Sequence, residues 1–374
     1  MKHKNLTRAL VLISVMGIVP SVSHSQGQIA FSTGDIVFKG DLRYRHEQIS
    51  QEGSKQRDRE RIRARFNLTA TVDPKINLII GLASDSSTDP ISRNQDLGAG
   101  FSTKSVWLDM AYIDWTTPLA GLKVQGGKMK NPFLAVGRNQ LIWDHDLTPE
   151  GLAAQYSKKS NTTEFFANAS YFWIAERSAG KENYLFGGQA GINQTMKTSL
   201  LTLGVSLYDY TNAKGYDTFV DAAKNFGNSV DAAKKYLYDF RVAEGFGQMS
   251  VIGVLPVPAS IYFNYATNTA SDVEDNTAYL VGATIGKAAQ KGSMGGQVFY
   301  RYVEHNAVVG AFSDSDFGGG GTNNKGFVFQ YDYQYAKNVT LSTTFYMNKL
   351  GVKDINGVAP KDYNRLQIDA VAKF

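Results

Sequence analysis

The feature that most constrains the fold is an alternation of polar and apolar residues, with a period of two, along much of the chain. Between Arg61 and Val72, apolar side chains at even positions alternate with arginine, asparagine and threonine at odd positions. A period of two places successive side chains on opposite faces of an extended strand. Each such run, including the last one from Arg365 to Phe374, therefore predicts a strand with one polar and one apolar face.

Hydropathy and composition further restrict the class of fold. After the N-terminus, no run approaches the roughly 20 apolar residues that a membrane-spanning helix needs. A membrane barrel remains compatible, because the apolar and polar residues of its strands average out. The chain has 20 Tyr, 21 Phe and 36 Gly but only 9 Pro, which suits many strands joined by flexible turns. It has no Cys, which excludes disulfides and cysteine metal sites.

Turn signals between the alternating runs predict the number of strands. Short turns are expected near Pro74, Pro118, Ser160, Met196, Pro256, Gln290 and Lys337. Long links are expected near 49–57, 85–103, 131–150, 175–183, 210–236, 269–275, 306–324 and 350–361. Outer-membrane barrels place short turns on the periplasmic side and long loops outside. We therefore predict an all-β fold, a transmembrane antiparallel β-barrel of about 16 strands whose N- and C-termini are both periplasmic.

The N-terminus reads as a secretory signal peptide. Lys2, Lys4 and Arg8 precede a short apolar core, which ends at Pro20 and is followed by small residues. We expect residues 1–25 to be a signal peptide and residues 26–374 to form the barrel. Without the signal, the formal charge falls from +5 to +2, because three bases and no acids are removed. The basic charge is therefore poor evidence for a nucleic acid partner, and none is expected.

A row of arginines follows the predicted second strand. Arg57, Arg59, Arg61, Arg63 and Arg65 alternate along it, and Arg43 and Arg45 lie on the first strand. An arginine that faces lipid near the bilayer midplane costs about 2–4 kcal/mol, so the row must face the lumen or lie above the membrane. We assign Arg61, Arg63 and Arg65 to the pore wall, and interpret Arg57 and Arg59 as a continuation of the solvated loop.

The stretch from Gly126 to Gly151 interrupts the alternation and carries most of the remaining chemistry. Within it, Pro132 predicts the point where the chain leaves the wall, because proline cannot continue the interior of a paired strand. Trp143 is expected to pack this segment against the wall, and Asp144 and Asp146 to face the arginines. A sugar-stacking role for Trp143 is the alternative.

Catalytic and metal chemistry find little support in the sequence. His46, His145 and His305 are the histidines outside the predicted signal, and their spacing does not converge on a metal site. No serine lies in a recognisable nucleophile motif, so a hydrolase is a remote alternative. No cofactor, metal or catalytic residue is predicted. A five-residue repeat, VDAAK at 220–224 and 230–234, is expected to form a short helix in the longest outer link.

Two blocks of sequence resemble the bacterial "putative porin" family. The first comprises GKMKNPF at 127–133, LIWDHDL at 141–147 and Glu150–Gly151; the second comprises YRYVE at 300–304, NAV at 306–308 and SDSDF at 313–317. The resemblance spans essentially the whole mature chain. It implies a sixteen-stranded outer-membrane porin of Gram-negative bacteria, trimeric as general porins are, that admits small hydrophilic solutes by diffusion.

The resemblance also implies which segment narrows the pore. In general porins the third outer loop folds inward, and the third long link here is 131–150. The acids of the seventh loop, Asp314 and Asp316, are interpreted as solvated, with a Ca²⁺ site as the alternative. The candidate pore and constriction residues are Arg43, Arg45, Arg61, Arg63, Arg65, Arg138, Trp143, Asp144, Asp146, Arg301, Asp314 and Asp316.

The leading functional hypothesis is a water-filled channel for passive diffusion of small hydrophilic solutes and ions, constricted by residues 131–150. The alternatives are a channel selective for small anions or carboxylates, and a structural or adhesin barrel. Expected partners are outer-membrane lipid and lipopolysaccharide, a homotrimer of the chain, and the barrel-assembly machinery, which reads a terminal aromatic such as Phe374. The sequence leaves the sign of ion selectivity open.

Overall fold

A computed structural model describes residues 35–85, 89–178, 180–251, 253–352 and 359–374. The predicted signal peptide, residues 1–25, lies outside this part of the chain and stays a prediction. No helix among the described residues has the length and apolar character needed to cross a membrane. Nearly all regular structure is β-strand, as the alternating pattern predicts.

Sixteen long strands form the wall of a closed antiparallel barrel. They are β1 (Ile36–Gln51), β2 (Arg57–Asp73), β3 (Ile76–Ser84), β5 (Val106–Thr116), β6 (Leu122–Lys128), β7 (Glu150–Ser160), β8 (Thr163–Ala175), β9 (Asn183–Thr195), β10 (Ser199–Tyr210), β11 (Phe240–Val251), β12 (Ala259–Asn268), β13 (Thr277–Gly286), β14 (Met294–Val303), β15 (Asn324–Ala336), β16 (Val339–Leu350) and β17 (Lys361–Lys373). The two-residue strand β4 (Gln95–Asp96) adds a short pairing to β2.

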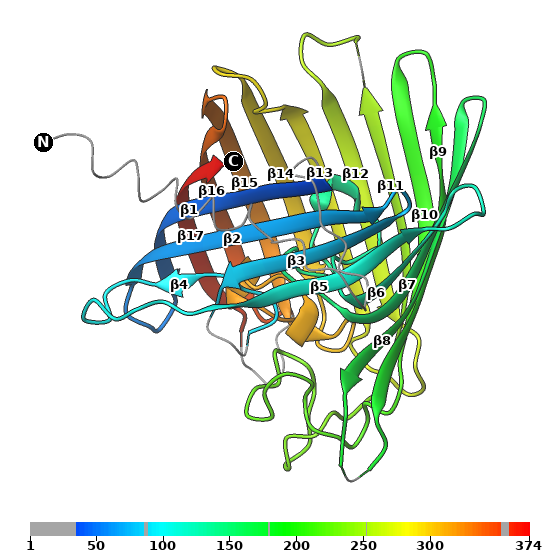
Figure 1. The fold of residues 1–374 in the computed structure, drawn as a ribbon. Coiled ribbons are helices and arrows are strands. Elements are labelled where there is room, and N and C mark those ends of the chain that lie inside the picture. Colours follow the sequence, from blue (N-terminus) through cyan, green and yellow to red (C-terminus); the bar gives the residue numbers. More distant parts are fainter. Residues whose placement is uncertain (1–34, 86–88, 179, 252, 353–358) are drawn as a thin grey trace, which may run out of the picture.

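The barrel closes through its first and last strands, which lie side by side (Figure 1). Their register runs from Asp41 opposite Lys373 to Gln51 opposite Tyr363. Each wall strand pairs with its two neighbours, so the backbone groups of the sheet find partners without water. Short turns gather at one end and long loops at the other (Figure 1), which confirms the predicted count and alternation of turns and loops.

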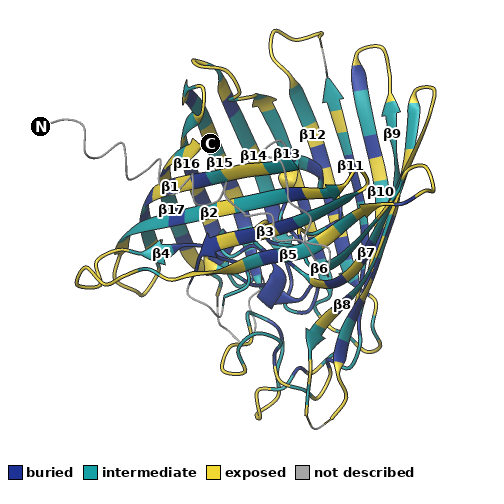
Figure 2. Cartoon of the chain, viewed as in Figure 1, coloured by how far each residue is buried: buried dark blue, intermediate teal, exposed yellow. Residues whose placement is uncertain are grey.

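The two faces of the wall differ as the period of two predicts, and Figure 2 shows alternating buried and exposed residues along the strands. On β12, Tyr262 and Asn264 point inward and are buried, whereas Ile261 and Phe263 point outward and are exposed. Similar exposed apolar side chains cover the outside of the other strands. A continuous apolar outer face of this extent suits a lipid environment.

The hydrophobic core lies inside the barrel, where two of three long loops fold into the lumen and the third packs against them. We name them loop 3 (129–149), loop 5 (211–239) and loop 7 (304–323); loop 2 (85–105) lies at the same end. Loop 3 contains the 3-10 turn η2 (Val136–Arg138), and loop 7 contains η3 (Gly310–Phe312) and η4 (Phe317–Gly319). Buried apolar residues of all three loops pack together against the inner face of β8 to β14.

The predicted helix in loop 5 is wrong. Each copy of the VDAAK repeat is a turn, in which the Asp side chain accepts a backbone N–H two residues later. Ala223 donates to Asp221 Oδ1 at 3.0 Å, and Ala233 donates to Asp231 Oδ1 at 2.8 Å. Aspartate offers the backbone this local alternative to a helix, and five residues are too few to offset the cost of helix nucleation.

The seam between β1 and β17 generates a prediction about Gly40. A β-carbon at this position would lie 2.4 Å from the ring of Phe374 and 2.5 Å from the carbonyl oxygen of Arg65. We expect Gly40→Ala to lower the free energy of unfolding by about 1–3 kcal/mol, because overpacking displaces the closing strand. Reversible urea unfolding in lipid vesicles measures this change.

The matched control is Gly188→Ala on β9, where a β-carbon meets no atom within 4 Å. We expect this variant to unfold like the parent chain. Equal stability of the two variants would contradict the role given to the seam.

Candidate pore: a charged wall and two inserted loops

Loop 3 crosses the lumen along a row of glutamines on the wall, one each from β7, β9, β11 and β14. Their side-chain amides bond to the backbone of the loop at four sites. Gln155 donates to Pro132 O at 3.0 Å; Gln189 accepts from Leu134 N at 2.8 Å; Gln248 accepts from Gly137 N at 2.7 Å; and Gln297 donates to Gly137 O at 2.9 Å. An irregular loop inside a barrel carries backbone groups that need partners, and these amides supply them.

The turn at Gly137 lies close against the wall, beside Tyr262 of β12. A β-carbon here would lie 2.3 Å from the ring of Tyr262, and the backbone has a φ of 57°. Glycine satisfies both requirements. Arg138, the next residue, is exposed at this turn.

Trp143 fixes the returning half of loop 3 to the wall, as the sequence predicts. Its ring packs edge-on against Tyr208 of β10, with centroids 5.1 Å apart, and lies parallel to Phe133 at 6.3 Å. Phe312 of loop 7 stacks on it from another side at 6.4 Å. The aromatic contacts therefore join loop 3, loop 7 and β10 into one packed unit.

Loops 3 and 7 run beside each other and share hydrogen bonds. Asp144 N donates to Phe312 O at 2.8 Å, and Asp314 N donates to Gln140 O at 3.3 Å. Ser315 N donates to the carboxylate of Asp144 at 2.9 Å. Loop 7 is thus also inserted into the lumen, beside loop 3, which the strand count did not predict.

Each of the two loops presents its acids in the same Asp-x-Asp arrangement. In loop 3, Asp144 Oδ1 accepts the N–H of Asp146 at 2.8 Å; in loop 7, Asp314 Oδ1 accepts the N–H of Asp316 at 2.8 Å. The first carboxylate therefore folds back onto the loop, as aspartates in turns do. The second carboxylate points towards the arginines of β1, β2 and β17.

Asp146 meets the arginines of β2. Its Oδ1 lies 3.3 Å from Arg65 Nη1 and 3.8 Å from Arg63 Nη1. Asp41 of β1 pairs with the same two guanidinium groups, at 2.9 Å from Arg63 Nη2 and 2.8 Å from Arg65 Nη2. The two arginines thus share one carboxylate of the wall and one carboxylate of the loop.

Asp316 meets arginines of β1 and β17. Arg45 Nη1 donates to it at 3.1 Å, and Arg365 Nη2 lies 2.7 Å from its Oδ1. Arg45 also binds Asp369 through two bonds of 2.7 Å, and Arg365 pairs with Glu47. Planar guanidinium groups suit this two-sided recognition of carboxylates.

The loop carboxyls divide into two kinds by their pKa. Burial on its own raises the pKa of a carboxyl, but Arg63, Arg65 and Arg43 bring the pKa of Asp146 below its ordinary value. For Asp316, Arg365 and Arg45 outweigh burial more strongly, so its pKa lies far below the ordinary value. The pairing of both groups therefore stabilises the fold above the unfolded pKa of about 3.9, and is lost only as the pH falls through the lower folded pKa.

Asp144 behaves in the opposite way. Burial, followed by the charges of Asp146 and Asp314, raises its pKa well above the ordinary value. Ionisation of Asp144 therefore lowers the free energy of unfolding at neutral pH. This destabilisation decreases as the pH is lowered through the raised pKa.

The structure places the predicted site residues in four places. Arg43, Arg45, Arg61, Arg63, Arg65, Asp146 and Asp316 meet at the arginine wall. Trp143 and Asp144 lie within the unit formed by loops 3 and 7, and Arg138 is exposed at the Gly137 turn. Arg301 and Asp314 form a buried pair at the root of loop 7, 3.4 Å apart.

Four interpretations from the sequence need correction. Asp314 and Asp316 are not solvated loop acids, because loop 7 carries them into the lumen to Arg301, Arg45 and Arg365. Arg59 does not continue a solvated loop: β2 begins at residue 57, and Arg59 pairs with buried Glu47. Asp144 faces loop 7 rather than an arginine. Arg301 is fully buried, so it anchors loop 7 and does not line a passage.

Sequence reasoning missed one organising residue, Arg93 of loop 2. Its guanidinium donates to Asp109 of β5 at 2.9 Å, to Asp85 at 3.2 Å and to the carbonyl oxygen of Asp146 at 2.8 Å. It thereby joins loop 2, the wall and the tip of loop 3. Nothing in its local sequence sets it apart, because Asp109 and Asp146 are 16 and 53 residues away.

Metal binding finds no support within the described parts of the chain, where no group of three or more His, Cys, Asp or Glu side chains could hold an ion. The Ca²⁺ alternative for the loop 7 acids therefore has no ligand set there. The carboxylates that Asp314 and Asp316 present are bonded to arginines and backbone N–H groups instead.

Taken together, the closed barrel of sixteen antiparallel strands, its apolar outside and its charged, loop-filled lumen define an outer-membrane barrel of the porin type. The family model described as "Putative porin" matches residues 38–240 and 258–374, and the chain belongs to this family. It is an integral outer-membrane β-barrel porin, and the family is not an enzyme family.

Solved porin structures share the fold at low sequence identity. OmpF of Salmonella typhi, solved in complex with daunomycin, is 12% identical with a TM-score of 0.54, and the match covers 91% of this chain and 97% of that one. OmpT of Vibrio cholerae, described as a trimer form, is 13% identical with a TM-score of 0.52, covering 91% and 99%. A search of curated proteins found no match.

The two kinds of loop carboxyl lead to a prediction. Asp146→Asn leaves Arg63 and Arg65 with Asp41 as their close carboxylate, so we expect a loss of about 2–4 kcal/mol in the free energy of unfolding at pH 7. Asp144→Asn removes a carboxyl whose ionisation is unfavourable there, so we expect a change within about 1 kcal/mol. Urea unfolding in vesicles compares the two variants. A larger loss from Asp144→Asn would contradict the arrangement described.

Proposed function

We propose that this porin forms a water-filled channel through which small hydrophilic solutes and ions diffuse, and that loops 3 and 7 together narrow it. The observation that carries the proposal is the contact of Asp146 and Asp316 with the arginine wall. These contacts bring both inserted loops to the same charged side of the lumen. A sixteen-stranded barrel is wide enough for an aqueous channel, and inserted loops reduce its width.

Cavities on both sides of the inserted loops support a passage. On the long-loop side, a cavity of about 440 Å³ is lined by Lys55, Arg57, Arg59, Arg61 and Arg365 together with Asp89 and Asp316. On the short-turn side, a cavity of about 530 Å³ lies beneath loop 3 and is lined largely by polar residues of β7 to β11. The cavity on the long-loop side is lined mainly by charged and polar residues, which suits hydrated solutes.

At the narrow level, arginines of β1, β2 and β17 form ion pairs with the loop carboxylates. The proposed passage therefore has one strongly charged side, and the electric field within it is uneven. Such a field orients polar solutes and biases ion selectivity. The cavity on the long-loop side has five bases and two acids, so we propose a preference for anions.

The proposed assembly is a homotrimer in outer-membrane lipid and lipopolysaccharide. The related OmpT is described as a trimer form. Recognition of Phe374 by the barrel-assembly machinery is also a proposal. In the folded barrel this residue packs beside Phe66, with ring centroids 6.0 Å apart, and its backbone pairs with Gly40.

Planar-bilayer recording of the purified, refolded protein tests the channel. We expect stepwise, ohmic conductance, and a reversal potential in a salt gradient that has the sign of anion preference. Correctly folded protein without conductance would overturn the proposal and would leave a structural or adhesin barrel.

Replacing Arg61, Arg63 and Arg65 together by Gln tests the position of the passage. We expect the reversal potential to shift towards cation preference, because Asp41, Asp146 and their neighbours lose their counter-charges. The matched control removes three bases from outside the lumen, Lys325, Lys349 and Arg241. Its selectivity should equal that of the parent. An unchanged reversal potential in the lumen variant would place the passage elsewhere.

A second candidate, a channel selective for small anions, is favoured by the five bases of the cavity on the long-loop side. Arginine binds carboxylates and phosphates through paired hydrogen bonds. In this case, millimolar phosphate or a small dicarboxylate should block chloride current in a saturable way. If the current instead varies linearly with the concentration of each of these anions, the protein is an unselective channel.

A further inference from the structure

A separate cavity of about 530 Å³ lies at the long-loop end, where the wall between β5 and β8 is incomplete. Pairing between β5 and β6 stops at Ala111 and Lys128, and pairing between β7 and β8 stops at Gly151 and Phe172. Above that level, and within the described residues, 106–110 of β5 have no strand partner on this side. Residues of loops 2 and 3 line the cavity beside this gap.

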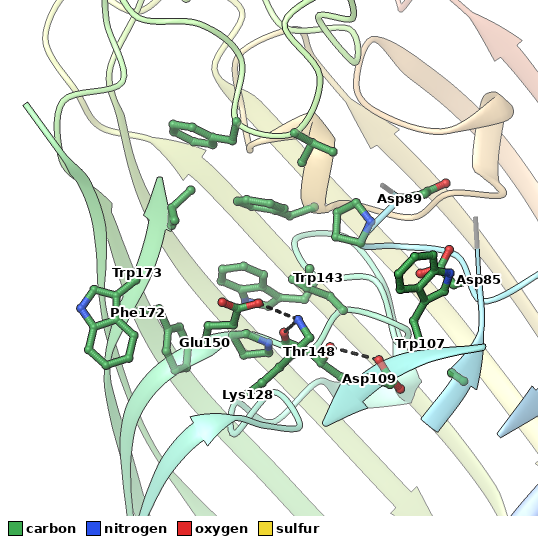
Figure 3. A pocket seen from close by; sticks show the side chains of 18 of the residues that line it. Asp85, Asp89, Trp107, Asp109, Lys128, Trp143, Thr148, Glu150, Phe172 and Trp173 are labelled. Atoms are coloured by element: carbon green, nitrogen blue, oxygen red, sulfur yellow. Dashed lines mark hydrogen bonds and ion pairs between the residues drawn. The ribbon is translucent and has the colours of Figure 1, made fainter. Parts of the chain in front are cut away.

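Aromatic side chains form much of the lining of this cavity (Figure 3). Trp107 comes from β5, Trp143 from loop 3 and Trp173 from β8, while Phe219 and Phe312 come from loops 5 and 7. The chain has four tryptophans, and three of them line this one cavity. Trp107 and Trp173 are about half exposed, at 48% and 50%, so part of the lining faces the surroundings of the barrel.

The charged residues of the lining carry an excess of negative charge. The acids are Asp85, Asp89, Asp109 and Glu150, and the bases are Arg93 and Lys128. Both bases already bind lining acids: Arg93 lies 3.2 Å from Asp85 and 2.8 Å from Asp109, and Lys128 lies 2.9 Å from Glu150. The lining therefore has a formal net charge of −2.

Asp89 is the acid of this lining that stands outside those pairs. Its Oδ1 accepts the N–H of Ile91 at 3.0 Å, and no ion pair to it is found among the described residues. Burial raises its pKa above the ordinary value. Asp89 also lines the cavity beside Arg57, Arg59 and Arg61, so it stands between the two spaces.

We propose that this cavity binds an organic cation with an apolar body, such as a quaternary ammonium that carries an aromatic ring. The apolar body lies among the tryptophans, and the ammonium group lies near Asp89. Ammonium groups are attracted to the faces of Trp rings, and a desolvated contact of this kind contributes about 2 kcal/mol. The carboxylate adds ion pairing in a partly buried setting.

Other occupants fit the lining less well. An anion meets an excess of negative charge, and a hydrocarbon chain leaves the carboxylates without partners. A metal ion lacks a ligand set among the described residues. The inference goes beyond passive diffusion, because it assigns a retained ligand to a site beside the entrance of the proposed passage.

Tryptophan fluorescence of the refolded chain in lipid nanodiscs tests the site without any measurement of transport. The probe is benzyltrimethylammonium, compared with its uncharged carbon isostere neopentylbenzene and with the anion phenylmethanesulfonate. We expect a saturable change in emission with the cation, and binding at least about tenfold tighter than with either comparison compound.

Two substitutions locate the bound cation. Asp89→Asn and Trp107→Ala should each weaken binding of the cation about tenfold, while Asp89→Asn leaves binding of the neutral isostere unchanged. Trp107 is about half exposed, so its truncation preserves the fold, and heat-modifiable migration on gels checks this. The controls are Asp272→Asn, an exposed acid of the link between β12 and β13, and Trp115→Phe, the tryptophan outside the cavity.

Four outcomes would overturn the proposal. The first is the absence of a saturable signal, and the second is equal binding of the neutral isostere, which would indicate an apolar pocket. The third is equal weakening by Asp272→Asn, which would indicate general attraction to a charged surface. The fourth is a signal seen in the monomer and lost in the oligomer, which would show that a second copy of the chain covers the gap.

Discussion

The need to satisfy every backbone amide within a lipid bilayer determines the rest of this structure. It requires a closed sheet, and closure between β1 and β17 turns the polar face of each strand inward. Seven arginines of β1, β2 and β17 then face a confined lumen: Arg43, Arg45, Arg59, Arg61, Arg63, Arg65 and Arg365. Like charges at this density repel and lose hydration, so the fold must supply carboxylates close by.

The carboxylates that pair with these arginines come partly from the barrel wall and partly from the inserted loops. Asp41, Glu47 and Asp369 belong to the wall itself and are present whatever the loops do. Asp146 and Asp316 arrive only when loops 3 and 7 fold into the barrel. Loop insertion and charge compensation are therefore coupled. The arginines hold the loops in place, and the loop carboxylates reduce the repulsion between the arginines.

Much of this arrangement could be predicted from the sequence, because strand period and turn residues are local signals. The arginines at 61, 63 and 65 could be assigned to the lumen from the cost of exposing them to lipid. The insertion of loop 7 could not be predicted in this way. The acids at 314 and 316 have the composition of a solvated loop, and the partners of Asp316, Arg45 and Arg365, are far away in the chain. Arg93 escaped notice for the same reason.

Because of the row of wall glutamines, the path of the loop 3 backbone and the ionic contacts of the loop depend on different residues. Gln155, Gln189, Gln248 and Gln297 hold its backbone through uncharged amides, which neither titrate nor respond to salt. The ionic contacts of the loop are confined to Asp146 and its surroundings. Substitutions at that tip can therefore alter which ions pass while the path of the loop stays the same. Related chains can diversify in selectivity through a few residues, without a new way of folding the loop.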